Sequence, residues 1–181
     1  MNLWIVLLRG INVGGHNTLR MAPLKSSLES EGFTDVLTYL QSGNLVCRSD
    51  LAQADEVQAA IKQLCQRVHG LSLDVWVGEA KQWTAMIDDN PFPQADVDPK
   101  SVHLFLAMHP IELGDSQLER LQGLTAFDES MHIQKSWIYL QAPSGIGRSK
   151  IAASMEKVVG QPLTARNWRT VQKIAGLIQP G

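Results

Sequence analysis

Apolar and polar residues follow the periods of strands and helices along the first half of the chain. A continuous apolar run over 3–8 predicts a buried strand, and helical spacing over 21–28 predicts the helix after it. Strands over 34–40 and 45–47 flank a polar turn at 41–44, which is typical of a hairpin. The chain therefore opens with the order strand, helix, strand, strand.

The first half closes with one more helix and one more strand. Apolar residues recur at helical spacing over 54–68 and stop at Gly70, a residue type that commonly ends helices. Apolar residues then alternate over 71–77, as in a half-buried strand. The first half is thus predicted to have the order β-α-β-β-α-β.

The second half repeats this theme after a helical stretch around Trp83 and a connector at 90–99 that is rich in proline and acidic residues. The predicted elements are a strand over 102–107, a helix around Leu118, a hairpin over 127–140, a helix over 151–159 and a last helix over 171–178. The predicted fold class is therefore α+β, with two tandem ferredoxin-like (β-α-β-β-α-β) halves packed as one unit and a C-terminal helix. We expect these halves at 1–90 and 91–181. Residue identity between them is slight, so chance agreement of the element order is the alternative.

Composition and charge exclude several classes of protein. The 181 residues are 44% hydrophobic and 19% charged, which predicts a soluble globular protein. A net charge of −2 opposes generic nucleic-acid binding and attachment to anionic membranes. No run approaches the roughly 20 apolar residues that a membrane-spanning helix needs.

The cysteines and histidines give no metal-binding pattern. Cys47 and Cys65 form no Cys-x-x-Cys pair, and no two histidines have the spacing His-x-x-x-His. The apolar opening follows no basic residue and ends at Arg9-Gly10, unlike a signal peptide. We therefore expect a cytoplasmic protein with reduced, buried thiols and no metal, and the sequence indicates no particular cofactor.

A first polar cluster follows the opening strand. It contains Arg9, Asn12, Gly14 and Gly15, where glycines allow sharp turns that expose backbone N–H groups to a ligand. The spacing nearly matches a phosphate-binding P-loop, but His16 replaces the lysine that reaches the terminal phosphates. Hydrolysis of a nucleoside triphosphate is therefore not expected. The alternative to a ligand site is a Gly-rich turn with Arg9 as a surface or interface ion partner.

A second polar cluster precedes the helix over 151–159. Its candidate ligand-binding residues are Gly145, Gly147, Arg148, Ser149 and Lys150. A helix N-terminus attracts anions, and cations placed there weaken the helix unless an anion is nearby. The alternative is that Ser149 caps the helix between two solvated basic residues.

A third cluster precedes the last helix, and a fourth lies in the first hairpin. Arg166, Asn167 and Trp168 could hold a base or a carboxylate, or they could only cap the helix and pack in the core. The hairpin residues Gln41, Ser42, Gly43 and Asn44 could offer amides to a ligand, or they could serve the turn alone.

Five ordered motifs together resemble one protein family. They are Arg9-Gly10-Ile11-Asn12-Val13-Gly14-Gly15, Met21 with Leu24, Tyr39-Leu40-Gln41-Ser42-Gly43-Asn44, the segment 147–150 and Thr164-Ala165-Arg166-Asn167-Trp168. Over nearly the whole chain they resemble the bacterial domain-of-unknown-function 1697 family. The resemblance implies an α+β fold of two ferredoxin-like halves and supplies no reaction.

Two functions are consistent with these clusters. The first is a site for a small anionic ligand, a nucleotide or a phosphorylated metabolite, in a cleft built from the Gly-rich and basic loops. In that case Arg9, Asn44, Arg148 and Arg166 should share one pocket. The alternative is a non-catalytic module that binds a protein partner. No catalytic triad, metal motif or paired acid and base can be read from the chain, so its status as an enzyme stays open.

Overall fold

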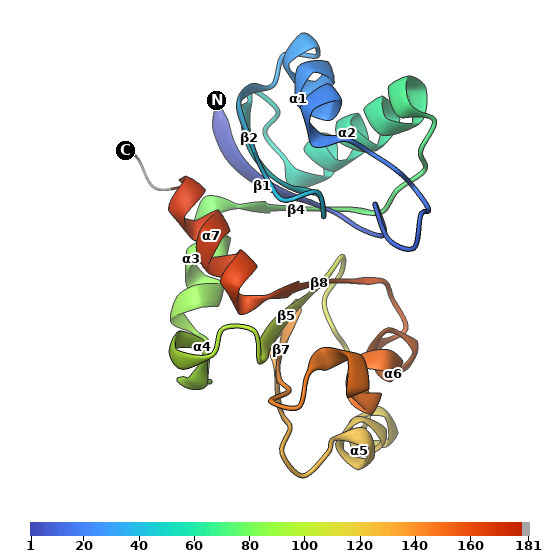
Figure 1. Ribbon diagram of the computed structural model, residues 1–181, viewed down its shortest axis with the longest axis vertical. Coiled ribbons are helices and arrows are strands. Elements are labelled where there is room, and N and C mark those ends of the chain that lie inside the picture. The colour runs from blue at the N-terminus through green and yellow to red at the C-terminus, as the bar shows by residue number, and fades with distance from the viewer. Residues whose placement is uncertain (179–181) are drawn as a thin grey trace. The chain divides into compact units, whose positions relative to one another are not determined.

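The computed structural model describes residues 1–178 and divides into two compact units (Figure 1). Among the described residues, unit 1 comprises Met1–Asp88 and 173–178, and unit 2 comprises Asp89–Gln172. The boundary on the C-terminal side falls inside the last helix, α7 (Trp168–Ile178), which therefore contributes residues to both units.

Unit 1 is an antiparallel four-stranded sheet with helices. Its elements are β1 (Asn2–Leu8), α1 (Met21–Ser30), β2 (Thr34–Tyr39), β3 (Asn44–Ser49), α2 (Ala54–His69), β4 (Val75–Glu79) and α3 (Ala80–Asp88). The strand order is β2-β3-β1-β4, and β1 pairs antiparallel with both β3 and β4.

Unit 2 has the same strand order in its own sheet. Its elements are α4 (Gln94–Val97), β5 (Val102–Ala107), α5 (Asp115–Leu124), β6 (Ser130–Ile133), β7 (Trp137–Gln141), the 3-10 turn η1 (Ile146–Arg148), α6 (Lys150–Val159) and β8 (Leu163–Asn167). The order β6-β7-β5-β8 places β5 between β7 and β8, as β1 lies between β3 and β4. The α+β class and the C-terminal helix are therefore confirmed.

Two local predictions differ from the structure, and one strand was not predicted. The strand predicted over 71–77 begins only at Val75. Phe127, predicted in a strand, lies in a loop and is fully exposed. The sequence pattern did not locate β8, because Thr164, Arg166 and Asn167 give this short edge strand a polar composition.

Two helices of the β-α-β-β-α-β segments, α2 and α6, have clear start and stop signals. The Glu56 carboxylate accepts hydrogen bonds from the backbone N–H of Ala52 and Gln53 at the start of α2, and Gly70 ends that helix with φ +67°. In α6 the hydroxyl of Ser149 accepts from the N–H of Ala152, and Gly160 ends the helix. Among residues 1–178, no helix combines the length and the apolar character that crossing a membrane requires.

Each unit has an apolar core between its sheet and its helices. In unit 1 this core contains Val6, Leu8, Cys47 and Cys65, which confirms that both cysteines are core residues. In unit 2 it contains Phe105 with other side chains of the sheet, α5 and α6. The opposite face of each sheet is apolar too, with Ile5 and Leu7 on β1 and Leu104 and Leu106 on β5 all buried.

Gly43 is required where the first hairpin meets β1. Its carbonyl accepts the N–H of Leu8 at 2.8 Å, and its φ is +78°. A Cβ at this position would lie 2.6 Å from the Cβ of Leu8 and 2.9 Å from Cδ1 of Ile11. Backbone conformation and close contact therefore both demand glycine.

Gly43→Ala should lower the free energy of unfolding by about 2–4 kcal/mol, because left-handed strain and overpacking act together. Gly160→Ala is the matched control, since Gly160 has φ +79° and a Cβ added there would meet no atom within 4 Å. It should cost only the strain, about 1–2 kcal/mol. Urea denaturation measures both values, and equal losses would show that the contact with Leu8 is unimportant.

His103 lies in the buried strand β5 and is only 8% exposed. Burial lowers the pKa of its imidazole below 6.5. Below about pH 6.5 the unfolded chain therefore takes up a proton that the folded chain does not, and stability falls with a slope of up to about 1.4 kcal/mol per pH unit. His103→Gln should remove this part of the pH dependence in denaturation series between neutral and acidic pH.

The exposed His109 supplies the control, since His109→Gln should leave the pH slope unchanged. A slope that is identical in the wild type and in His103→Gln would mean that His103 takes up its proton equally in both states.

Candidate functional site

The Gly-rich loop after β1 is a small hairpin. The N–H of His16 donates to the carbonyl of Val13 at 3.0 Å, and Gly14 and Gly15 between them have φ +58° and +79°. Two consecutive left-handed residues are the signature of a type I′ turn. The glycines therefore serve this turn, and the next helix begins only at Met21, unlike a P-loop, which leads directly into a helix.

Asn12 connects this loop to the first β-hairpin. Its amide exchanges hydrogen bonds with the backbone N–H and carbonyl of Leu19, both at 2.9 Å, and also donates to the carbonyl of Gln41. The Gln41 side chain accepts from the N–H of Met21. The structure thus brings together two of the predicted groups, residues 9–15 and residues 41–44.

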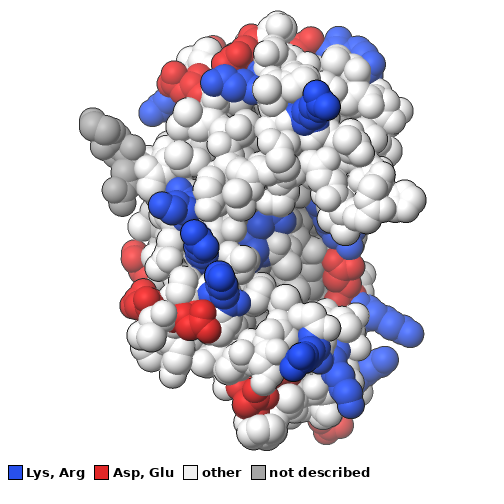
Figure 2. All heavy atoms as spheres, viewed as in Figure 1, with Lys and Arg blue, Asp and Glu red and all other residues white. Residues whose placement is uncertain are grey.

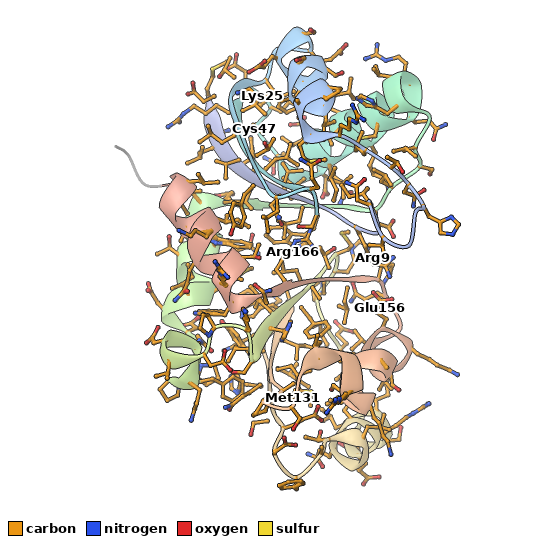
Figure 3. The ribbon with its side chains drawn as sticks, viewed as in Figure 1. Arg9, Lys25, Cys47, Met131, Glu156 and Arg166 are labelled. Atoms are coloured by element: carbon orange, nitrogen blue, oxygen red, sulfur yellow. The ribbon has the colours of Figure 1, made fainter. Side chains whose placement is uncertain are left out.

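The other polar groups of these two loops are also engaged. The Asn44 amide is fully buried and donates to the carbonyl of Tyr39 at 2.8 Å and to the hydroxyl of Ser42 at 3.0 Å. Arg9, labelled in Figure 3, forms an ion pair with Asp74 at 3.3 Å in which both side chains are partly exposed. Such a pair contributes about 0–1 kcal/mol. These contacts support the turn and surface-ion-pair interpretations of both loops.

The second and third clusters leave the sheet of unit 2 from the same edge. β7 ends at Gln141, which is paired with Val102, and β8 ends at Asn167, which is paired with His103. Because Val102 and His103 are the first residues of β5, the loop after β7 and the start of α7 flank one end of that strand. The topology therefore places residues 145–150 and 166–168 at one sheet edge.

The basic residues at the start of α6 are exposed and unpaired. Arg148 and Lys150 flank the capping residue Ser149, and neither has an ion pair among residues 1–178. The first turn of α6 contains no acidic residue. Gly145, with φ +95°, and Gly147 are exposed in the loop that precedes the helix.

Arg166 lies on the sheet face opposite α5 and α6, and Figure 3 labels it. It is half-buried, and one guanidinium nitrogen donates to the carbonyl of Ala165 at 2.8 Å. Burial lowers its pKa to about 10, because removal from water disfavours the charged form. Thr164 shares this face of β8, is 1% exposed, and its hydroxyl has no hydrogen-bond partner within the described chain. A partly desolvated cation and a buried hydroxyl thus lie two residues apart.

Asn167 and Trp168 have structural roles. The Asn167 side chain accepts the N–H of Thr170 at 3.0 Å and so caps α7. Trp168 is buried, and its ring centroid lies 6.2 Å from that of Tyr139. These contacts support capping and core packing, which the sequence analysis gave as the alternative for this cluster.

The two thiols do not have the character of reactive cysteines. Burial raises the pKa of Cys47 to about 12 and that of Cys65 to about 11, so both stay protonated at neutral pH. Among residues 1–178, no three His, Cys, Asp or Glu side chains lie close enough to share a metal ion.

Sequence reasoning missed three features that could serve a ligand. His103 and Thr164 are buried polar residues of unit 2. A histidine inside the apolar run 102–107 is a signal that could have identified the first. The third feature is a cavity in unit 1 lined by residues of ordinary type, for which the sequence holds no signal. We predicted from the sequence that all four clusters share one pocket. Two of these clusters belong to unit 1 and two to unit 2, and their convergence stays a prediction.

Comparison with known proteins places the chain in a family. No curated protein matches it. A solved structure with a similar fold is that of the conserved bacterial protein SP0830 from Streptococcus pneumoniae, with a TM-score of 0.77 and 22% sequence identity over 98% of this chain and 99% of that one. The sequence profile described as "Protein of unknown function (DUF1697)" matches residues 1–139, so the chain belongs to the DUF1697 family.

Proposed function

We propose that this protein binds a small anionic ligand, a nucleotide or a phosphorylated metabolite, at the basic sheet edge of unit 2. The observation that carries the proposal is that two cations, Arg148 and Lys150, lie at the N-terminus of α6 and form no ion pair among residues 1–178. Lys150 is the first residue of the helix and Arg148 lies two residues before it, where backbone N–H groups already present a partial positive charge.

Electrostatics favours an anion at this position. Each cation near a helix N-terminus costs about 0.3–1 kcal/mol of helix stability, and no acidic residue of the first turn offsets that cost. An anion bound there would interact with the side-chain cations and with the helix dipole together. The unfavourable arrangement in the free protein would then become favourable in the complex.

Arg166 and Thr164 support the same ligand class. Arg166 holds a positive charge in a partly desolvated position, where interaction with an anion is stronger than in bulk water. The buried hydroxyl of Thr164 can donate a hydrogen bond on the face of β8 that Arg166 occupies, which is the face opposite α6. A phosphate group accepts several hydrogen bonds at once and matches such donors.

The overall charge argues for a small ligand and against a generic nucleic acid. The chain has a net charge of −2, and acidic and basic side chains are interspersed on the face shown in Figure 2. Nonspecific nucleic-acid binding depends on many phosphate contacts from an extended basic surface. A few clustered cations suit a ligand that carries one or two phosphates.

A second candidate function is a non-catalytic interaction module, and exposed apolar residues favour it. Val13 at the tip of the small hairpin is 67% exposed, and Leu40 in the neighbouring loop is 55% exposed with φ +57°. The bond from Asn12 to Gln41 holds these two loops together. Exposed apolar side chains on adjacent loops can dock against a protein partner.

We infer further that both units are ferredoxin-like and that the protein is cytoplasmic. The shared β-α-β-β-α-β order and the strand order β2-β3-β1-β4, repeated as β6-β7-β5-β8, support the fold. The free thiols of Cys47 and Cys65 support the location, because reduced cysteines are usual in the cytoplasm.

The double substitution of Arg148→Gln and Lys150→Gln tests the anion site. Titration with pyrophosphate and with ADP by calorimetry should show binding to the wild type that weakens as salt is added. Each lost cation should weaken binding by about tenfold to a hundredfold, as expected for a charge-assisted hydrogen bond. The free energy of unfolding should stay unchanged or rise by up to about 1 kcal/mol, because the unfavourable interaction of the two cations with the helix dipole is removed.

Two control substitutions separate binding from folding. Lys157→Gln removes an exposed cation from the opposite end of α6 and should leave anion affinity unchanged. Asn167→Ala should cost about 1 kcal/mol of stability through loss of the helix cap. The proposal would be contradicted if the wild type bound neither pyrophosphate nor ADP. It would also be contradicted if the double variant at Arg148 and Lys150 were clearly less stable than the wild type.

A further inference from the structure

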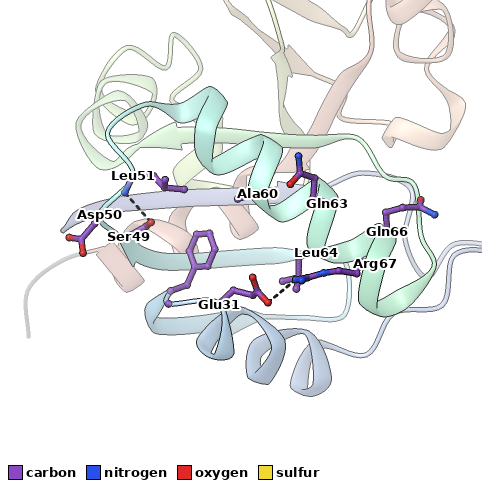
Figure 4. A pocket seen from close by; sticks show the side chains of 11 residues that line it. Glu31, Ser49, Asp50, Leu51, Ala60, Gln63, Leu64, Gln66 and Arg67 are labelled. Carbon is purple, nitrogen blue, oxygen red and sulfur yellow. Dashed lines mark hydrogen bonds and ion pairs between the residues drawn. The ribbon is translucent and has the colours of Figure 1, made fainter.

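A cavity in unit 1 is lined by none of the candidate site residues that the sequence suggests. Its volume is about 830 Å³, within the range of roughly 300–1,000 Å³ that is usual for small-molecule sites. Three segments form its walls: the link between α1 and β2, the link between β3 and α2, and one side of α2 (Figure 4).

The interior of this cavity is apolar and contains an aromatic ring. Phe33, Leu51, Ala60 and Leu64 line it, and Phe33 and Leu64 are also members of the unit 1 core. The inner wall of the cavity, formed by Phe33 and Leu64, is thus part of the packed core of unit 1. An apolar inner wall with one aromatic ring favours a ligand with a planar, mainly apolar body.

The charged residues at the rim are already paired. Arg67 forms an ion pair with Glu31 at 2.7 Å, drawn as a dashed line in Figure 4, and Asp50 pairs with the N-terminal ammonium group of Met1 at 3.5 Å. A charged ligand would have to displace one of these pairs or enter an apolar space without a partner, and burial of an unpaired charge is costly. The rim therefore selects for a neutral ligand.

Uncharged polar groups complete the site. The side chains of Gln63 and Gln66 line the cavity and have no hydrogen-bond partner among residues 1–178. Ser49 also lines it, and its hydroxyl oxygen accepts the N–H of Leu51 at 3.2 Å, which leaves the hydroxyl hydrogen to donate. These groups can orient a ligand through neutral hydrogen bonds.

We propose that this cavity is a binding site for a neutral aromatic molecule that carries one or two hydrogen-bonding groups. The site is independent of the anion site in unit 2, because no residue that lines it belongs to that unit. The chain would then bind two chemically different small molecules in its two units.

N-phenyl-1-naphthylamine and 8-anilino-1-naphthalenesulfonate are matched probes for this site. The two molecules share the same aromatic body, but only the second carries a sulfonate. Fluorescence titration of the full chain should show that the neutral probe binds at least about tenfold more tightly, because the sulfonate has no unpaired cation at the rim. Equal or tighter binding of the sulfonate probe would overturn the proposal.

Ala60→Leu tests the location of the neutral probe. The larger side chain should project into the cavity from α2, obstruct the bound aromatic ring and weaken binding by at least about tenfold without loss of thermal stability. Ala59→Leu is the matched control, because Ala59 is the exposed neighbour on the same helix and does not line the cavity. Equal affinities of these two variants would show that the probe binds elsewhere.

Gln63→Met provides a second test that does not depend on repacking. Gln63 is exposed on α2, so the substitution should leave folding intact while it removes one amide. Loss of one neutral hydrogen bond should weaken binding by about threefold to tenfold. Chemical-shift changes in the backbone amides of Ser49, Ala60 and Leu64 should accompany binding of the probe, and their absence would also refute the site.

Discussion

Each unit of this protein is built around one strand that is buried on both of its faces. Every residue from Trp4 to Leu8 in β1 and from Val102 to Ala107 in β5 is buried. A strand in this position must satisfy its backbone by pairing on both sides, and β1 and β5 each do so with two antiparallel neighbours. Because the side chains on these two strands are mostly apolar and buried, few of them can bind a ligand. Most polar residues with that capacity lie in the segments that connect the strands.

Most of those polar residues hold the connections in place. Asn12, Asn44, Ser149 and Asn167 all use side-chain groups to satisfy nearby backbone N–H or carbonyl groups. Such bonds matter because an unsatisfied buried polar group costs about 1–3 kcal/mol. A polar motif in a sequence is therefore a poor guide to a ligand until its internal bonds are known. Arg148 and Lys150 differ because nothing in the described chain pairs with them.

The cavity in unit 1 shows the opposite relation between sequence and site. Its lining residues belong to helical and strand-end patterns and attract no attention as a motif. They form a concavity only because two chain links and α2 come together around Phe33 and Leu64. Selectivity there would come from shape and from paired rim charges, whereas selectivity at the start of α6 would come from unpaired charge.

The sequence by itself determined the α+β class, most of the elements and the burial of both cysteines. These properties depend on local periodicity, which a buried strand such as Val102–Ala107 or a capped helix such as α6 displays directly. The sequence also offered capping as the alternative role of Ser149 and Asn167, and it could do so because capping is a contact between near neighbours. The pattern did not locate β8, since an edge strand with alternating polar residues has no continuous apolar run.

Only the tertiary structure decided that Asn12 bonds to Gln41, that Arg166 is half-buried beside Thr164, and that a cavity forms beside Phe33. These features join residues that are distant in sequence or depend on what surrounds them, and local periodicity carries no information about such contacts.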